Sequence, residues 1–529
     1  MNQYKVLIPS AGLGTRLGDF SKNLNKALVS LDNKPVISHV IEKFPKHIEI
    51  VVALGHKGDL VRDYLQMAHS DRQITCVDIE NYCGNGSGLG LTILECKEYL
   101  QCPFVFCPND TVILEEVPEP STNWVGYAEV ENNHHYRSFK LSDGGLVERV
   151  CEKEEVLSYD TKPYIGLAGI KDYEAFWTAM EDGKKYGSIK IGESYALREM
   201  VKQKINIQAR KFTWYDTGNL ESLTAARELV KSKDAPEILE KANEAIWFVN
   251  DRVIKYNSDP RFISDRAYRA ELLKGYVPEI TSVKDNMYSY RMLTGKTMSK
   301  ATNQKTFKKL LDYLMFFWEP VSLSKQETKD FNEICKIFYK EKTEKRIELY
   351  FNRFSEKDCI ENINGSNVPT IRELLDQIDW SKLYDGKASR MHGDLHFENI
   401  LVAETGDFYL LDWRQDFGGI TEYGDVYYDL AKLLHGMIVS HELINKDHYQ
   451  VNQMDNVITY DLYRKHCLVE NEKQFYDFLY ENNFDIYKVR LLTALIFLNI
   501  APLHHYPYSK MLFYLGKESL YNILGRRNE

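Results

Sequence analysis

A glycine-rich segment near the N-terminus combines a flexible backbone with two cations. Residues 9–28 read PSAGLGTRLGDFSKNLNKAL and follow an apolar, strand-like run. Gly12 and Gly14 allow the backbone to turn tightly and to bring N–H groups close to an anion, and Arg16 and Lys26 add positive charge nearby. The third glycine of the dinucleotide-binding fingerprint and the GK[ST] of a P-loop are both absent. The pattern therefore predicts a phosphate site of a different kind.

A second segment carries the residue types of a kinase. Residues 391–413 read MHGDLHFENILVAETGDFYLLDW, an H-G-D-x-H-x-x-N pattern followed by an aspartate that closes a short apolar run. Phosphoryl transfer from ATP to an alcohol needs a carboxylate that takes or orients the hydroxyl proton, and two ligands that hold Mg²⁺ against the phosphates. Asp394, Asn399 and Asp412 supply that set, so the segment predicts phosphoryl transfer.

The first segment resembles the nucleotidyltransferases that make activated sugars and CDP-alcohols, whose signature is GxGTRL followed by a lysine in a PKAL-like element. Here the element reads NKAL, with Asn25 in place of the usual proline. The resemblance implies that Arg16 and Lys26 offset charge while a phosphate oxygen of the acceptor attacks the α-phosphorus and pyrophosphate leaves. It also implies that the loop cradles the nucleotide phosphates through Ala11, Gly12, Gly14 and Thr15.

The same resemblance extends over roughly residues 4–228. FCPNDTVI places Asp110 at the family's first metal-binding aspartate, and WYDTGN places Asp216 at the second. CEKEE places Lys153 where the family has a lysine that reaches the acceptor phosphate. Two carboxylates and phosphate oxygens are hard ligands of the kind Mg²⁺ prefers, and the ion would act as a Lewis acid and a clamp.

The segment NYCGNGSGLGLT, residues 81–92, occupies the place where this family reads the nucleobase. Gly86 and Gly88 would let the backbone approach a flat ring or a phosphate. The family's commoner glutamine-containing pattern is absent. We predict CTP as the nucleotide, alongside the ATP used by the second site.

The second segment resembles the aminoglycoside phosphotransferase and choline kinase superfamily. The resemblance implies that Asp394 is the base and that Asn399 and Asp412 bind Mg²⁺. His392 is expected to brace the loop, and His396 is expected to be structural or solvated. A D-F-G occurs at Asp416, but it lies past the end of the strand, so Asp412 ranks above it as the metal ligand.

The same resemblance places a strand lysine in RVIKY, where Lys255 would contact the α- and β-phosphates of ATP. Its acidic helix partner is open between Glu271 and Asp265. Over roughly 244–440 the chain also resembles kinase-like proteins found with capsule and surface-glycan enzymes.

The elements that must position these residues change character along the chain. Through about residue 230, strand-like runs such as KVLIPS and EIVVALG alternate with helix-like stretches such as DLVRDYLQMA. This alternation predicts an α/β domain whose ligands collect at the carboxyl ends of the strands. With the resemblance, the expected fold is a Rossmann-like nucleotidyltransferase domain, with a mainly parallel mixed sheet and helices on both faces, followed by a kinase-like α+β two-lobed domain.

The expected boundaries are a nucleotidyltransferase domain over 1–228, a linker helix over 229–243 and a kinase-like domain over 244–529. That last domain would have a small lobe over about 244–300 and a helical large lobe over about 301–529. Two sequence patterns support a β-containing small lobe followed by a helical large lobe. AIWFVNDRVIKYNSD predicts a β-hairpin turning at Asn250 and Asp251, and the apolar spacing from Phe307 to Phe317 predicts a helix with one buried face.

Composition excludes several classes of protein. The chain has 529 residues and a formal net charge of −10, so no global basic field recruits nucleic acid or an anionic membrane. Nine cysteines without a CxxC pair indicate reduced thiols rather than a disulfide framework or a zinc site. The apolar run LLTALIFLNIAPL is shorter than the ~20 residues of a membrane span and predicts a buried helix. We expect a cytoplasmic protein without membrane insertion.

Together the two halves predict consecutive reactions on one small hydroxyl compound, R-OH. ATP would phosphorylate R-OH, and the phosphorylated product would then react with a nucleoside triphosphate to give NDP-R and pyrophosphate, a donor for surface polysaccharide. R is predicted to be a sugar or polyol. An amino-alcohol such as choline or ethanolamine is the alternative, and Trp413, Tyr427 and Tyr428 are candidates for an aromatic cage. A non-catalytic, ATP-sensing kinase-like half is a further alternative.

Overall fold

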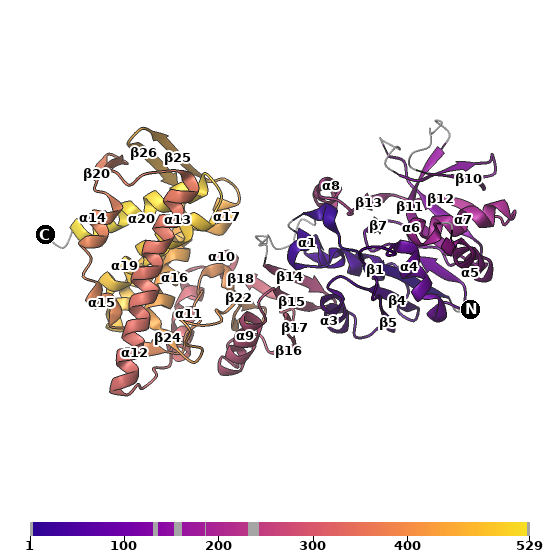
Figure 1. Cartoon of the computed structure of the whole chain (residues 1–529). Coiled ribbons are helices and arrows are strands. Elements are labelled where there is room, and N and C mark those ends of the chain that lie inside the picture. Colours follow the sequence, from indigo (N-terminus) through magenta and orange to yellow (C-terminus); the bar gives the residue numbers. More distant parts are fainter. Residues whose placement is uncertain are drawn as a thin grey trace. The chain divides into compact units, whose positions relative to one another are not determined.

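The computed structural model describes residues 4–18, 20–130, 136–152, 161–185, 187–230 and 243–525. Contacts group the chain into two compact units (Figure 1). The first unit comprises Met1–Pro260 and Thr281–Met292, and the second comprises Arg261–Ile280 and Leu293–Glu529. Compact units defined by contacts need not coincide with functional domains, so the expected domain boundaries remain predictions. Residues 231–242, most of the expected linker helix, lie outside the described part of the chain.

A mixed sheet forms the centre of the first unit. Nine strands of its described part run in the order β10-β9-β11-β6-β1-β4-β5, with β8 beside β11 and β12 beside β8. The strands are β1 (Lys5–Ser10), β4 (Glu49–Leu54), β5 (Ile74–Asp78), β6 (Phe104–Phe106), β8 (Trp124–Tyr127), β9 (Ser138–Leu141), β10 (Val147–Cys151), β11 (Thr161–Ile170) and β12 (Gln208–Lys211). β6, β1, β4 and β5 are parallel, and β11 runs antiparallel to β6. The predicted mainly parallel, mixed α/β sheet is confirmed.

Helices cover both faces of this sheet because side chains alternate along each strand. Val6 of β1 belongs to a core cluster with Tyr64 of α3 (Gly58–Ala68). Leu7 belongs to a second cluster with Ile93 of α4 (Leu89–Glu95) and Phe176 of α5 (Tyr173–Asp182). The shorter elements of this unit are η1 (Thr15–Leu17), α1 (Phe20–Asn23), η2 (Lys26–Leu28), β2 (Ser30–Leu31), β3 (Lys34–Pro35), η3 (Lys97–Tyr99), β7 (Thr111–Ile113), η5 (Gly183–Lys185), α6 (Ser188–Ile191) and β13 (Trp214–Asp216). Its longer helices are α2 (Val36–Ile41), α3 (Gly58–Ala68), α4 (Leu89–Glu95), α5 (Tyr173–Asp182), α7 (Glu193–Lys202) and α8 (Leu220–Val230).

A four-stranded antiparallel sheet, in the order β14-β15-β17-β16, packs onto this α/β core. Its strands are β14 (Glu244–Val249), β15 (Arg252–Asn257), β16 (Ile280–Lys284) and β17 (Met287–Arg291). β14 and β15 form the predicted hairpin, whose turn residues Asn250 and Asp251 both have positive φ, as a type I′ turn requires. The indole of Trp247 is fully buried and packs edge-on against Tyr64, with ring centroids 5.2 Å apart.

Trp247 anchors this second sheet, so Trp247→Ala is expected to destabilise the first unit by about 3–5 kcal/mol, the range for deleting a buried aromatic side chain. The substitution also removes the hydrogen bond that Trp247 Nε1 donates to Ser30 Oγ at 3.0 Å. Urea unfolding followed by circular dichroism measures the loss. Leu229→Ala, at a side chain that is 70% exposed, is the control. A loss below about 1 kcal/mol for Trp247→Ala would contradict the anchoring role of this indole.

The second unit is mainly helical. Its helices are α9 (Pro260–Leu272), α10 (Met298–Ala301), α11 (Gln304–Phe317), α12 (Lys325–Lys336), η6 (Ile337–Glu341), α13 (Lys342–Phe354), α14 (Ile371–Asp376), α15 (Trp380–Tyr384), η7 (Phe397–Asn399), α16 (Val426–Ile438), α17 (His441–Ile444), α18 (His466–Glu481), α19 (Ile486–Ile500), η8 (Ala501–Leu503) and α20 (Tyr508–Gly525). Its short strands are β18 (Gly295–Thr297), β19 (Glu361–Ile363), β20 (Ser366–Val368), β21 (Ala388–Ser389), β22 (Ile400–Ala403), β23 (Phe408–Leu410), β24 (Gly424–Asp425), β25 (Tyr449–Met454) and β26 (Val457–Leu462).

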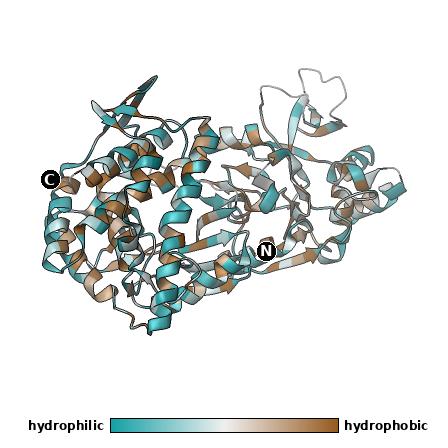
Figure 2. Cartoon of the chain, turned by 60° about the vertical axis from the view of Figure 1, so that its left-hand side comes forward, coloured by the Kyte–Doolittle hydropathy of each residue, from teal (hydrophilic) through white to brown (hydrophobic). Residues whose placement is uncertain are grey.

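Helices α11, α12 and α13 of this unit bury one face each, whereas α16 and α19 are buried on all sides. The predicted stripe of α11, from Phe307 to Phe317, is buried, and apolar and polar residues alternate along the helices in Figure 2. Among the described residues, one stretch, Ile486–Leu503, is long and apolar enough to cross a membrane, but 67% of it is buried inside the protein. Its helix α19 packs against α13, α16 and α20, as expected for a core helix.

Candidate active sites

A cavity of about 420 Å³ opens in the first unit where the strands of the central sheet end. Gly12 and Arg16 from the loop after β1 line it, together with Lys26, Asp110 and Asp216. The sequence places these residues up to about 200 positions apart, and the fold brings them to one edge of the sheet, as expected for a parallel sheet.

Register explains why the two aspartates meet. β13 pairs antiparallel with β7, and Asp216 is the register partner of Thr111, the neighbour of Asp110. A Cβ placed on Gly218 would lie 3.0 Å from Asp216 Oδ1 and 3.1 Å from Asp110 Oδ2, so both carboxylates converge on one point. Only glycine leaves this point open.

Lys26 forms an ion pair with Asp110, with 3.0 Å between Nζ and Oδ2. Asn25 positions this lysine: its side chain donates to the Ser10 carbonyl at 3.0 Å and accepts from the Ala27 N–H at 2.9 Å. The residue that replaces the family's proline therefore ties the lysine loop to the end of β1. Burial raises the pKa of Asp110, but Lys26 and Arg16 outweigh it and leave that pKa below its usual value.

Asp216 is held differently. Its Oδ1 accepts from the Gly218 N–H at 2.8 Å, and its Oδ2 accepts from the Tyr136 hydroxyl at 3.3 Å. Burial raises the pKa of Asp216, and the hydrogen bond from Gly218 only partly offsets this effect. Two converging carboxylates fit Mg²⁺, a hard cation that would also meet phosphate oxygens here.

The remaining predicted residues of this site lie as follows. Ala11 lines the cavity, Gly14 adopts the left-handed conformation with φ 67°, and Thr15 begins η1. Gly86 has φ 85°, and Gly88 caps α4 and lines the cavity. Lys153 lies outside the described residues.

Tyr136, Arg137 and Glu193 line the cavity but come from segments without a spacing motif, so sequence reasoning misses them, whereas Trp214 belongs to the WYDTGN segment. Tyr136 and Trp214 line the cavity and pack edge-on, with ring centroids 5.2 Å apart. Arg137 also lines it and pairs with Glu152 at 2.7 Å. Glu193, at the start of α7, is buried at the cavity wall, and burial raises its pKa to about 7.

The second candidate site surrounds Asp394 in the second unit. Lys432 of α16 forms an ion pair with it, with 2.7 Å between Nζ and Oδ1. Asn399 donates to the Asp394 carbonyl at 2.9 Å, so the predicted base and the predicted metal ligand are adjacent. Burial favours the neutral acid, but Lys432 and His396 outweigh it and hold the pKa of Asp394 well below its usual value. Asp394 is therefore ionised at neutral pH.

His392 and Asp429 brace this loop. The Nε2 of His392 lies 2.8 Å from the Leu411 carbonyl, and burial lowers the pKa of His392 to about 3, so the ring is neutral. The carboxylate of Asp429 accepts the N–H groups of His392 and Gly393, each at 2.7 Å. Asp429 lies in the run GDVYYDLAK, residues 424–432, and is thus the residue that holds the loop backbone, a role that spacing along the chain does not indicate.

Asp412 follows β23 closely and has a positive φ of 56°, an unusual conformation for a non-glycine residue. Its carboxylate pairs with Arg266 of α9. Asp416 instead accepts the Gly419 N–H at 2.8 Å and so closes a turn. Lys255 lies on β15 in the first unit, is buried, and remains a sequence-based candidate.

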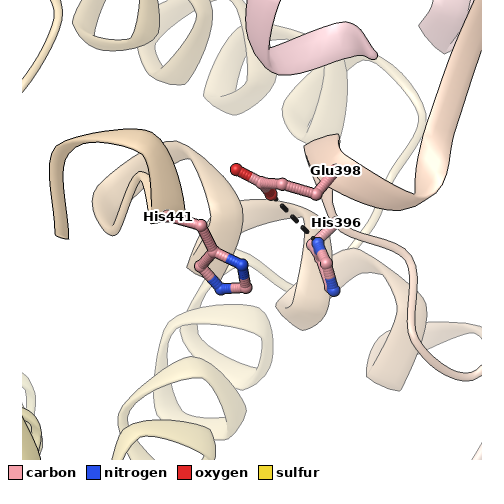
Figure 3. A group of neighbouring side chains, drawn as sticks. All are labelled: His396, Glu398 and His441. Atoms are coloured by element: carbon pink, nitrogen blue, oxygen red, sulfur yellow. Dashed lines mark hydrogen bonds and ion pairs between the residues drawn. The ribbon is translucent and has the colours of Figure 1, made fainter. Parts of the chain in front are cut away.

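His396 is buried rather than solvated. Figure 3 shows it beside Glu398 and His441, with 3.0 Å between His396 Nδ1 and Glu398 Oε2. Its Nε2 lies 3.7 Å from Asp394 Oδ2. Donor atoms of His396, Glu398 and His441 lie within 4.8 Å of one another, a set of types that could hold a metal ion. Burial opposes a charge on His396, but Asp394 and Glu398 raise its pKa to about 9, so it forms a charged bridge between the two carboxylates.

Lys432 gives a direct test of this electrostatic arrangement. Lys432→Met removes the cation that favours the Asp394 carboxylate, so the pKa of Asp394 is expected to rise. Because a base works only when ionised, the acid limb of the kcat profile for ADP release should move to higher pH, and kcat should fall about 10–100-fold. Lys446→Met, at a side chain that is 58% exposed, is the control. An unchanged pH profile would show that Lys432 does not act on Asp394.

Known proteins resemble each half of the chain. Residues 340–452 match the family described as Phosphotransferase enzyme family. The chain is 28% identical over 177 residues to Bifunctional protein GlmU of Methanococcus vannielii. The matched stretch covers 32% of this chain and 41% of that protein. It is 27% identical over 244 residues to Low-salt glycan biosynthesis nucleotidyltransferase Agl11 of Haloferax volcanii, covering 43% of this chain and 66% of that protein. The chain therefore spans less than two thirds of the length of either relative.

Solved structures match the N-terminal half. One is the CTP:phosphocholine cytidylyltransferase LicC of Streptococcus pneumoniae, at 16% identity and TM-score 0.36, covering 43% of this chain and all of that one. Another is a UDP-glucose pyrophosphorylase complexed with UDP-glucose, at 20% identity and TM-score 0.37, covering 43% of this chain and 98% of that one. The chain is thus similar to nucleotidyltransferases in its N-terminal half and matches the phosphotransferase enzyme family over residues 340–452, in agreement with the fusion that its sequence predicts.

Proposed function

We propose that the chain is a bifunctional enzyme that makes a nucleotide-activated donor in two steps. First, R-OH and ATP give R-O-phosphate, ADP and a proton. Second, R-O-phosphate and CTP give CDP-R and pyrophosphate. R is a sugar or polyol, the donor serves surface polysaccharide, and the enzyme acts in the cytoplasm. The observation that carries the proposal is the presence of two separate charged sites, each built around an ionised aspartate paired with a lysine.

In the kinase half, the Asp394 carboxylate accepts the hydroxyl proton of R-OH, and Lys432 keeps that carboxylate ionised. Asn399 and Asp412 would hold Mg²⁺, which neutralises charge on the ATP phosphates. His392 and Asp429 fix the backbone beside the base, so the carboxylate is positioned before substrate binds.

In the nucleotidyltransferase half, Arg16 and Lys26 bind the negative charge of the triphosphate, and the loop at Gly12 and Gly14 lets backbone N–H groups approach it. Lys153 is assigned to the acceptor phosphate. Asp110 and Asp216 would hold Mg²⁺, which supplies Lewis-acid activation for displacement of pyrophosphate. The order of steps follows from the chemistry, since the kinase product is the transferase acceptor.

Release of pyrophosphate from a grid of acceptors and nucleotides tests the proposal. Each sugar or polyol is offered with ATP and either CTP, UTP or GTP, and parallel wells receive the corresponding phosphate without ATP. We expect pyrophosphate from one alcohol only when ATP is present, and from its phosphate without ATP, with CTP as the preferred nucleotide. Pyrophosphate formation that does not depend on ATP with any acceptor would contradict the proposed kinase step.

An amino-alcohol remains a second candidate for R because Tyr136 and Trp214 give the first cavity two aromatic side chains, which suit a quaternary ammonium. The kinase half offers less support. Trp413 is fully buried, and the ring of Tyr427 already carries the Lys488 ammonium 4.4 Å from its centroid. Phosphocholine and phosphoethanolamine belong in the same grid, and pyrophosphate from either of them would favour this candidate.

A further inference from the structure

Two cations flank one aromatic ring beside the kinase loop. Lys342 Nζ lies 4.1 Å from the centroid of the Phe338 ring, and Arg414 Cζ lies 5.1 Å from the same centroid. Lys342 begins α13, and Arg346 follows one helical turn later on the same face. Tyr428 of α16 packs edge-on against Phe338, with ring centroids 5.0 Å apart, and Lys342 Nζ lies 5.9 Å from the centroid of the Tyr428 ring.

This group lies next to the predicted base. The backbone N–H of Arg414 donates to the His392 carbonyl at 2.9 Å. A Cβ on Gly393, the residue before Asp394, would lie 2.6 Å from Arg414 Cβ, so the arginine packs directly on the loop. Lys432, paired with Asp394, adds a fourth cation from α16.

The four cations of this group have fewer carboxylate ion-pair partners than their number requires. Lys432 uses Asp394, and no carboxylate among the described residues forms an ion pair with Lys342, Arg346 or Arg414. Burial is the main reason why the pKa of Lys342 is well below its usual value, and the nearby charges of Arg414 and Arg346 lower it further. Burial and Arg414 also lower the pKa of Arg346. Half-buried cations that repel one another raise the free energy of the folded chain. An anion bound among them would lower that free energy by offsetting their repulsion.

We propose that Lys342, Arg346 and Arg414 form the acceptor subsite of the kinase half and that the acceptor is an anionic hydroxyl compound, one that carries a carboxylate or a phosphate besides the hydroxyl it offers to Asp394. This inference rests on the proposed kinase function and narrows R to an acidic sugar or polyol derivative. It disfavours choline, whose positive charge would meet four cations. The cluster is assigned to the acceptor because it adjoins the group that takes the acceptor's proton, whereas Asn399, Asp412 and Lys255 are assigned to Mg²⁺ and ATP.

Matched acceptors of equal carbon skeleton test the charge requirement. Gluconate is compared with sorbitol, and glycerol 3-phosphate with glycerol, so a carboxylate and a phosphate are each set against a neutral hydroxyl. Phosphoryl transfer is followed by ADP release. Binding is measured by titration calorimetry on the Asp394→Asn chain loaded with a non-hydrolysable ATP analogue and Mg²⁺. The acid of at least one pair should bind more than about tenfold more tightly than its neutral partner, as expected for charge-assisted contacts.

The cluster itself is tested by Lys342→Met, with Lys345→Met as the matched control on the same helix, at a side chain that is 77% exposed. In Lys342→Met the affinity for the acid should fall, and its KM should rise, by about tenfold or more while KM for ATP stays unchanged. Lys345→Met should resemble the parent chain. Circular dichroism verifies folding, and Arg346→Gln, which keeps a polar side chain on the same face, provides a second variant with the same expectation.

Three results would overturn the subsite. They are equal or tighter binding of the neutral partner in both pairs, a change in KM for ATP rather than for the acceptor, and unchanged acid binding in both cluster variants. The proposed kinase function fails separately, through absence of ADP release with every acceptor while the acid still binds. Phosphoryl transfer to neutral acceptors alone would support the proposed kinase function and contradict the anionic acceptor subsite.

Discussion

Asp394→Asn is expected to lower kcat for phosphoryl transfer by about 10²–10⁴-fold, the contribution of a general base. The amide keeps the shape of the side chain but cannot accept the hydroxyl proton, and it leaves Lys432 without its 2.7 Å ion-pair partner. Nucleotidyl transfer from presynthesised R-O-phosphate should be unchanged, because we propose that this chemistry uses the cavity of the first unit. Measurement of ADP release and of pyrophosphate release on the same preparation separates the two effects.

The control for this variant is Asp407→Asn, at an exposed aspartate in the turn before β23 whose carboxylate accepts from Thr405 Oγ1 at 2.7 Å. It should keep both activities. Loss of pyrophosphate release in folded Asp394→Asn would show that one site performs both reactions, and the two-site proposal would then be wrong.

Asp110→Asn is expected to lower the rate of nucleotidyl transfer by about 10²–10³-fold, comparable with the loss of one group that stabilises charge in a transition state. The substitution removes a charged oxygen from the point where Asp110 and Asp216 converge, and it unpairs Lys26. Phosphorylation of R-OH by ATP should continue, so R-O-phosphate should accumulate. A coupled assay that follows ADP and pyrophosphate together records this.

Asp143→Asn, at an exposed aspartate in the turn after β9, is the matched control and should form NDP-R normally. Retention of pyrophosphate release in Asp110→Asn would exclude Asp110 as a metal ligand. Raising the Mg²⁺ concentration should restore part of the lost rate if the defect lies in metal binding.

The sequence was informative where function depends on short, local segments. The loop from Gly12 to Lys26 and the loop from His392 to Asn399 each follow or precede a strand, so spacing along the chain largely determines spacing in space. The hairpin at Asn250 and the buried stripe of α11 were predictable for the same reason, since turn chemistry and helical periodicity act over a few residues.

Residues that reach a site from distant elements could not be predicted in this way. Lys432 lies 38 positions after Asp394 on the buried helix α16, and its ion pair with Asp394 depends on how α16 packs against the loop. Glu193 and Arg137 reach the first cavity from a helix and a loop that share no motif with it. The sheet from β14 to β17 likewise packs on the first unit through Trp247, a contact between residues far apart in sequence. Such contacts follow from tertiary packing, which overrides local pattern.

The most direct test of two consecutive sites is a ³¹P NMR time course of the full chain with Mg²⁺, ATP and CTP and with a pool of sugars, polyols, their acids or amino-alcohols. If both sites act in turn, a phosphomonoester appears first and then declines as a diphosphodiester and pyrophosphate grow together. A monoester that persists would leave a kinase without its transferase partner. If ATP and CTP remain unchanged with every pool, while ATP still binds, the kinase-like half would be a sensor and the bifunctional proposal would be contradicted.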